Sequence, residues 1–216
     1  MTFEELIDRV KVKMEEYTPF AETTAIAASE SMGFETKPIV SYIKRTIDEA
    51  ANEMLMVLPL HLIRSEKMTI IEQIRYTNGS GVIGLGENFL RVHRFKMKDW
   101  RTTLHHAEYE GSPIAQLQDN PYTRGRAYKP VLVYHRSLDV FPKNKSLSYY
   151  SCPAGSTQEI ETAWQVSRFD KDDFQEDLTE FYALNCAKKV YDIYGMSDKS
   201  SLIGGELDKL IETYNR

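Results

Sequence analysis

Cysteine is scarce in this chain of 216 residues, which contains only Cys152 and Cys186. The two lie far apart in the sequence, and neither has another Cys or a His at the spacing of metal ligands. We therefore expect no disulfide and no structural zinc. The first five residues are acidic and lack the basic and apolar regions of a signal peptide, which predicts a reduced, intracellular protein.

Long apolar runs are also missing. No run approaches the ~20 apolar residues that span a bilayer, so we expect no membrane insertion. The chain instead has 42% hydrophobic and 11% aromatic residues, which is enough for a packed core and argues against global disorder. Tyrosine is frequent, with 13 residues against 2 Trp. Tyrosine can cover a core or contact a partner, and the sequence leaves both roles open.

Charge is divided unevenly along the chain. Residues 1–60 contain 6 basic residues (Lys and Arg) and 11 acidic ones (Asp and Glu). Residues 61–150 contain 14 basic and 8 acidic residues, and residues 151–216 contain 7 basic and 13 acidic residues. The net charge of −5 therefore combines a basic middle, which also holds all five His, with two acidic flanks. Such asymmetry concerns partners rather than fold. It predicts that the middle meets an acidic surface, including the flank of a neighbouring copy.

Helical patterns occupy both ends of the chain. Thr2 and Glu5 have the spacing of a capping box and predict a helix over residues 3–16. Apolar residues at helical intervals predict further helices over residues 38–58 and 174–194, the latter capped by Gly195, and a last one from about residue 200. The helix over 38–58 and that over 174–194 each have one apolar stripe, so we expect them to pack antiparallel. Residues 24–31 suit a loop or a short helix.

Strand patterns occupy the middle. Short apolar or alternating runs predict strands at residues 68–71, 81–84, 89–97, 131–134, 138–141 and 147–150. In residues 89–97 the odd-numbered side chains are expected on one face and the even-numbered ones on the other, and residues 111–128 are expected to form a long loop. The sequence thus predicts an α+β fold, in which a bundle of about four helices (residues 1–60 plus 170–216) is interrupted by a mostly antiparallel, β-rich insert (residues 61–169).

Two patterns that could indicate a cofactor or a metal are better explained without one. The glycine pattern of residues 79–84 resembles a dinucleotide loop, but a strand rather than a helix follows it, which favours a hairpin turn. His105 and His106 would point to opposite faces of a strand and would not chelate one ion together. No Gly-x-Ser-x-Gly elbow occurs. We therefore predict no cofactor, no metal and no catalytic residue.

Basic side chains form two groups in the middle region. They suit phosphate contacts or an acidic protein surface, and the negative net charge together with their alternation along strands favours the protein surface. The candidate intersubunit charge contacts are Arg91, Arg94, Lys96, Lys98, Arg101, Arg124 and Arg126.

The last helix carries an apolar stripe. Its members are Leu202, Leu207, Leu210, Ile211 and Tyr214. The Gly204-Gly205 pair weakens this helix in isolation by ~1 kcal/mol per Gly relative to Ala. We interpret the stripe as a candidate docking helix that orders on a partner, the alternative being that it completes the protein's own bundle.

Four short motifs occur in one order through the insert. They are Glu87-Asn88-Phe89-Leu90-Arg91-Val92, Met97-Lys98-Asp99-Trp100-Arg101, Gly111-Ser112-Pro113 and Lys129-Pro130-Val131. This order resembles the head-to-tail adaptor, or tail tubular (connector ring), proteins of short-tailed phages, most of all the ring proteins of crAss-like phages. In that family a β insert interrupts a helical pair and opens with an acidic residue before Phe-Leu-Arg. Family members often have Leu-Pro before that residue, whereas this chain has Leu85-Gly86.

The resemblance implies a non-enzymatic virion protein at the head-tail junction, assembled in the host cytoplasm. Such proteins form a homo-oligomeric ring, usually of twelve copies, which joins the portal to neighbouring ring or tail proteins. The ring lines the channel through which DNA leaves, so DNA would be a non-specific passenger. The alternative from another class is a cytosolic α+β enzyme or ligand-binding domain with a site in the basic strands.

Overall fold

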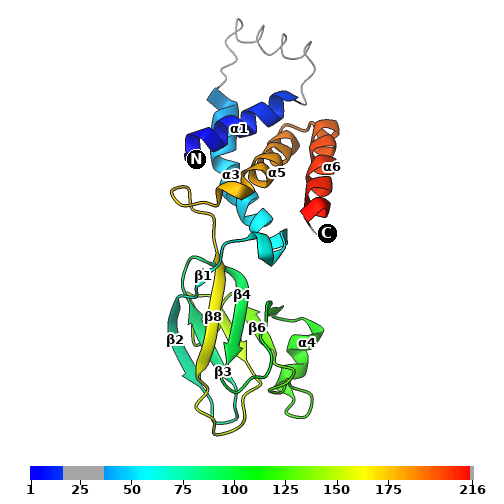
Figure 1. Cartoon of the computed structure of the whole chain (residues 1–216). Coiled ribbons are helices and arrows are strands. Elements are labelled where there is room, and N and C mark those ends of the chain that lie inside the picture. The colour runs from blue at the N-terminus through cyan, green and yellow to red at the C-terminus, as the bar shows by residue number, and fades with distance from the viewer. Residues whose placement is uncertain (17–36, 215–216) are drawn as a thin grey trace, which may run out of the picture. The chain divides into compact units, whose positions relative to one another are not determined.

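The computed structural model describes residues 1–16 and 37–214. The chain divides into two compact units, a helical unit of Met1–Ile63 with Phe169–Arg216 and a β unit of Arg64–Arg168 (Figure 1). Helices and sheets together make an α+β protein, which confirms the predicted fold class. The short helix considered for residues 24–31 lies outside the described residues.

The helical unit contains α1 (Phe3–Glu16), α3 (Lys37–Val57), α5 (Thr179–Ile193) and α6 (Ser197–Tyr214), with short 3-10 turns at Leu60–Leu62 and Glu176–Leu178. The capping box begins α1 as predicted. Glu5 Oε2 accepts from the Thr2 main-chain N at 2.7 Å, and Thr2 Oγ1 accepts from the Glu5 N at 3.3 Å. Gly195, at φ 71°, ends α5, and the Met196 N donates back to the Tyr191 carbonyl as in a Schellman motif.

Helix α5 forms the centre of this unit and contacts α1, α3 and α6. The predicted stripe of α3 faces it, and Ile43, Ile47 and Ala50 have no exposed surface. Helices α3 and α5 run antiparallel, as expected. Tyr42, near the start of α3, contacts Tyr194, just past the end of α5. Ala50, which lies further along α3, bonds Asn185, which lies earlier in α5.

The β unit contains two sheets. One has the order β1-β8-β4, and the other has the order β2-β3-β7-β6-β5. Every pairing is antiparallel except that of β5 with β6, in agreement with a mostly antiparallel insert. One hydrophobic core joins the two sheets and includes Ile83, Phe89, Phe95 and Leu147. The strands are β1 (Glu66–Lys67), β2 (Ile70–Arg75), β3 (Gly81–Leu85), β4 (Phe89–Met97), β5 (Glu108–Tyr109), β6 (Leu132–His135), β7 (Ser146–Tyr149) and β8 (Ile160–Ser167).

The glycine pattern of residues 79–84 belongs to the β2–β3 hairpin. Gly79 has φ 83° in the turn, and strand β3 follows directly, so the hairpin interpretation is confirmed. Gly81 has a packing role, because a Cβ there would lie 2.2 Å from the hydroxyl oxygen of Tyr149. The positive φ of the turn thus explains Gly79, and the close approach of the Tyr149 side chain explains Gly81.

Three local expectations differ from the structure. In β4 the buried side chains include both Phe89 and Val92, because the pairing with β8 shifts register three times and breaks strict alternation. The segment of residues 111–128 contains a short helix, α4 (Pro113–Gln116), followed by a 3-10 turn (Leu117–Asp119). Residues 138–141 form a turn rather than a strand, since the Phe141 N donates to the Leu138 carbonyl.

Candidate interaction surfaces

Two lysines, one on β4 and one directly after it, are paired with carboxylates within the β unit. Lys96 Nζ lies 2.8 Å from Glu161 Oε2 on β8, and Lys98 forms an ion pair with Glu159. The hydrogen bond from Lys98 to Glu159 raises the pKa of that lysine. Intersubunit contacts by these two lysines stay a prediction, and each already has a carboxylate partner in its own chain.

The predicted arginines differ from one another in setting. The guanidinium of Arg94 lies over the ring of Trp164, with its central carbon 5.8 Å from the ring centroid. Arg91 is half-buried, and this burial lowers its pKa although the neighbouring Tyr109 opposes the shift. Arg101 is exposed, and its main-chain N donates to the Ala127 carbonyl at 2.8 Å. The strand group therefore touches the segment that carries Arg124 and Arg126.

Residues 111–129, called the α4 loop from here on, are organised by their own hydrogen bonds. Ser112 caps α4, since its Oγ accepts from the Ala115 N at 3.1 Å. The side chain of Gln118 is 2% exposed, donates to the Ile114 carbonyl and accepts from the Gly125 N, each at 2.8 Å. A buried amide that bonds both limbs fixes the conformation of the loop.

The α4 loop presents apolar and aromatic side chains to solvent. Tyr122 is 90% exposed and Tyr128 64%, and Ile114 and Leu117 of the same loop are also exposed. Tyrosine and arginine are enriched in the energetic centres of protein interfaces. An ordered loop with this composition fits a protein partner, and it is the surface on which the predicted Arg124 and Arg126 lie.

A further group of cations, which sequence reasoning missed, gathers at the turn of residues 86–89 between β3 and β4. Lys145 Nζ donates to the Phe89 carbonyl at 2.6 Å, and the Arg168 main-chain N donates to the Asn88 carbonyl at 2.8 Å. Burial, together with repulsion from Arg168 and Arg136, lowers the pKa of Lys145. We call Arg136, Lys145 and Arg168 the cationic cluster. No sequence motif links these three residues, because the sheet pairings alone bring them together.

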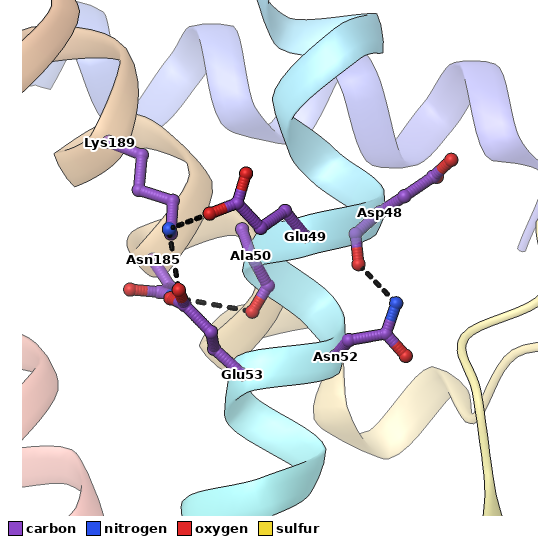
Figure 2. Close-up of polar contacts among 7 residues, drawn as sticks. All are labelled: Asp48, Glu49, Ala50, Asn52, Glu53, Asn185 and Lys189. Carbon is purple, nitrogen blue, oxygen red and sulfur yellow. Dashed lines mark hydrogen bonds and ion pairs between the residues drawn. The ribbon is translucent and has the colours of Figure 1, made fainter. Parts of the chain in front are cut away.

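The α3–α5 contact contains a polar group inside the helical unit (Figure 2). Lys189 Nζ lies 2.9 Å from Glu49 Oε1 and 2.6 Å from Glu53 Oε1. Burial alone would lower the pKa of Lys189, but the hydrogen bonds to the two carboxylates raise it above its ordinary value. These groups hold two helices of one chain together, so we assign them a structural role.

The stripe of α6 is divided between the core and the surface. Leu207 is 4% exposed in the core of the helical unit, and the ring of Tyr214 lies 5.5 Å from that of Phe181. Leu210 and Ile211 are half-buried, whereas Leu202 is 61% exposed. The helix thus contributes to its own bundle, and Leu202 is the member of the stripe most accessible to a partner.

Chemistry-bearing clusters are few in the part of the chain that the structure describes. It contains no group of three or more His, Cys, Asp or Glu side chains placed to hold a metal ion. Nor does it contain a helix with the length and hydropathy of a membrane span. Cys152 and Cys186 are buried, and burial raises the pKa of each thiol to about 12. No protein-family model and no curated protein matches this chain.

Proposed function

We propose that this chain is a non-enzymatic virion structural protein that forms a homo-oligomeric ring at the portal vertex. The observation that carries the proposal is the division of charge between the two units. The helical unit has 12 Lys and Arg against 22 Asp and Glu, a net charge of −10, and the β unit has 15 against 10, a net charge of +5. Unlike charges on two parts of one chain attract the β unit of one copy to the helical unit of the next.

Such a contact is heterologous, since it joins two different surfaces of the same chain. Heterologous contacts repeat from copy to copy and close into a ring when the rotation allows. The α4 loop adds the exposed Tyr122, Tyr128 and Arg126 to the basic partner of this contact. The resemblance of the insert motifs to connector ring proteins adds the rest of the proposal, namely about twelve copies, a portal and a tail protein as neighbours, and a lumen that passes DNA without reading its sequence.

The rival is a cytosolic α+β enzyme or ligand-binding domain with a site in the basic strands. The cationic cluster is the observation that favours it, because convergent cations are suited to a small anionic ligand. The two functions differ in where the protein is found. A connector ring protein is a stoichiometric part of the particle, whereas a cytosolic protein is absent from purified particles.

Two measurements test the proposal. The purified full chain is examined by analytical ultracentrifugation and negative-stain electron microscopy, and we expect closed rings in equilibrium with smaller species. Purified virions are analysed by mass spectrometry, and we expect about twelve copies for each portal vertex. A chain that stays monomeric at every accessible concentration and is missing from the particles contradicts the proposal and leaves the rival.

A further inference from the structure

The cationic cluster is built by main-chain geometry rather than by chance proximity of long side chains. Strand β7 begins at Ser146, directly after Lys145, whose carbonyl accepts from the Leu85 N at 2.9 Å. Strand β8 ends directly before Arg168, whose N donates to Asn88. Both cations are therefore attached to the short β3–β4 connection, Lys145 through Leu85 and Phe89, which flank it, and Arg168 through Asn88 within it.

Arg136 joins them from the end of β6. It follows His135, the last residue of that strand, and its charge acts on Lys145 and on Tyr134 together with that of Arg168. The ring of Tyr134 stacks at 6.0 Å on Phe89, which is the residue whose carbonyl holds Lys145. The same few residues thus bring all three cations to one end of the β unit.

Carboxylates do not neutralise this cluster within the described residues. Neither Arg136 nor Arg168 forms an ion pair there, and Glu87, which lies in the same connection, forms none either. This contrasts with Lys96 and Lys98, whose carboxylate partners are Glu161 on β8 and Glu159 directly before it. Three like charges held together by the fold create a positive potential that a bound anion relieves.

We propose that Arg136, Lys145 and Arg168 form a binding site for a phosphate group. A phosphate monoester carries a charge of about −1.5 to −2 and three acceptor oxygens, which matches three cationic donors, whereas a carboxylate offers one charge and two oxygens. Two guanidinium groups give forked, bidentate contacts to phosphate. Lys145 adds the two ammonium hydrogens that its bond to Phe89 leaves over. The inference does not depend on whether the chain forms a ring.

The phosphate can come from a free phosphate ester or from a nucleic-acid backbone. Tyr109 distinguishes these sources, because this residue is 59% exposed and its ring stands edge-on to that of Tyr134, with the ring centroids 6.1 Å apart. An exposed aromatic ring beside a phosphate site provides a face on which a base can stack. A contribution of Tyr109 to binding therefore identifies a nucleic acid, and its absence identifies a phosphate ester.

The test uses the full chain with two probes, inorganic phosphate followed by calorimetry and a fluorescent single-stranded oligonucleotide followed by anisotropy. We expect at least one probe to bind, and we expect Arg136→Gln/Arg168→Gln to weaken that binding by at least about tenfold, since it removes two guanidinium groups that donate charge-assisted hydrogen bonds to the anion. The charge-preserving Arg136→Lys/Arg168→Lys variant should recover part of the affinity, and a melting curve checks that each variant folds.

Arg75→Gln is the matched control. Arg75 is an exposed arginine of the same unit, but it pairs with Gly81 at the opposite end of the sheet from Ser146 and its neighbour Lys145. If Tyr109→Leu lowers the affinity for the oligonucleotide, the site binds nucleic acid. If inorganic phosphate binds as tightly as the oligonucleotide, the site binds free phosphate esters. No binding of either probe, equal weakening in Arg75→Gln, or tighter binding of a polyglutamate peptide overturns the proposal.

Discussion

Asn185 on α5 donates a hydrogen bond of 2.9 Å from its side-chain amide to the main-chain carbonyl oxygen of Ala50 on α3 (Figure 2). The same amide nitrogen lies 3.2 Å from Glu53 Oε2, and the residue is 4% exposed. A buried amide that joins two helices fixes their register, because any sliding of α3 along α5 would leave a polar group unsatisfied.

Replacing this amide tests its role. We expect Asn185→Ala to lower the free energy of unfolding by about 1–3 kcal/mol, the cost of losing the buried hydrogen bonds to the Ala50 carbonyl and the Glu53 carboxylate. Asp192→Ala, at an exposed position of the same helix, is the control and should stay within about 0.5 kcal/mol of the wild type. Urea denaturation measures both. Equal stability of the two variants would show that the amide is dispensable.

The core position of Ile47 gives a second prediction. Ile47 has no exposed surface, so Ile47→Asp should cost several kcal/mol through an unpaired buried charge. Val57 on the same helix is 61% exposed, and Val57→Asp should change stability little. If thermal melting of Ile47→Asp matches that of the wild type, the assignment of this face of α3 to the core is wrong.

Helix α6 allows its core and docking roles to be separated within one stripe. Leu207→Asp should reduce the melting temperature by many degrees, because its side chain is buried, whereas Leu202→Asp should leave it nearly unchanged. If the stripe also docks on a portal or a second ring, Leu202→Asp should still weaken that attachment. Truncation after Ser200 should then abolish both stability and attachment, since it removes both leucines. A truncated chain with an unchanged melting temperature would refute the core role of α6.

Features encoded by neighbouring residues were predictable from the sequence. The capping box of Thr2 and Glu5 and the apolar stripe of α3 depend on spacings of three and four residues, and the structure confirms both. The hairpin at Gly79 depends on a conformation that glycine adopts readily. Local chemistry fixes such elements before any tertiary contact forms.

Features set by pairing between distant segments were not predictable. The faces of β4 depend on three register shifts against β8, some 70 residues later in the chain, and Val92 is consequently buried. The partners of Lys96 and Lys98 come from that same pairing. The cationic cluster combines the ends of three strands, so no window of sequence contains it.

The cysteines give a prediction for reactivity and for pH. Burial raises the pKa of both Cys152 and Cys186 to about 12, so a thiol reagent at pH 8 should label neither until the protein unfolds. Unfolded thiols ionise near pH 8.5 while the folded ones stay protonated. Their contribution to stability is therefore complete below about pH 8.5 and is lost as the pH rises towards 12.

A Cys152→Ala/Cys186→Ala variant isolates this effect from the titration of tyrosines. Its free energy of unfolding should fall less than that of the wild type between pH 8 and pH 10, as measured by urea denaturation. Identical pH profiles for the two proteins would mean that the thiols do not contribute. Rapid labelling of the native protein would show that one of them is accessible.

The charge division makes assembly sensitive to salt. If the basic β unit of one copy meets the acidic helical unit of the next, added salt should weaken the ring, because the Debye length falls from about 10 Å at 0.1 M to about 3 Å at 1 M. Sedimentation of the full chain in rising concentrations of NaCl should show rings dissociating into smaller species.

Arg124→Glu/Arg126→Glu should cause the same loss of rings at low salt, since both side chains belong to the α4 loop. Lys67→Glu, at an exposed position of β1, is the single-charge control and should have little effect. Rings that persist unchanged to 1 M NaCl would indicate an apolar interface, for which the exposed Tyr122 and Tyr128 would be the first residues to replace.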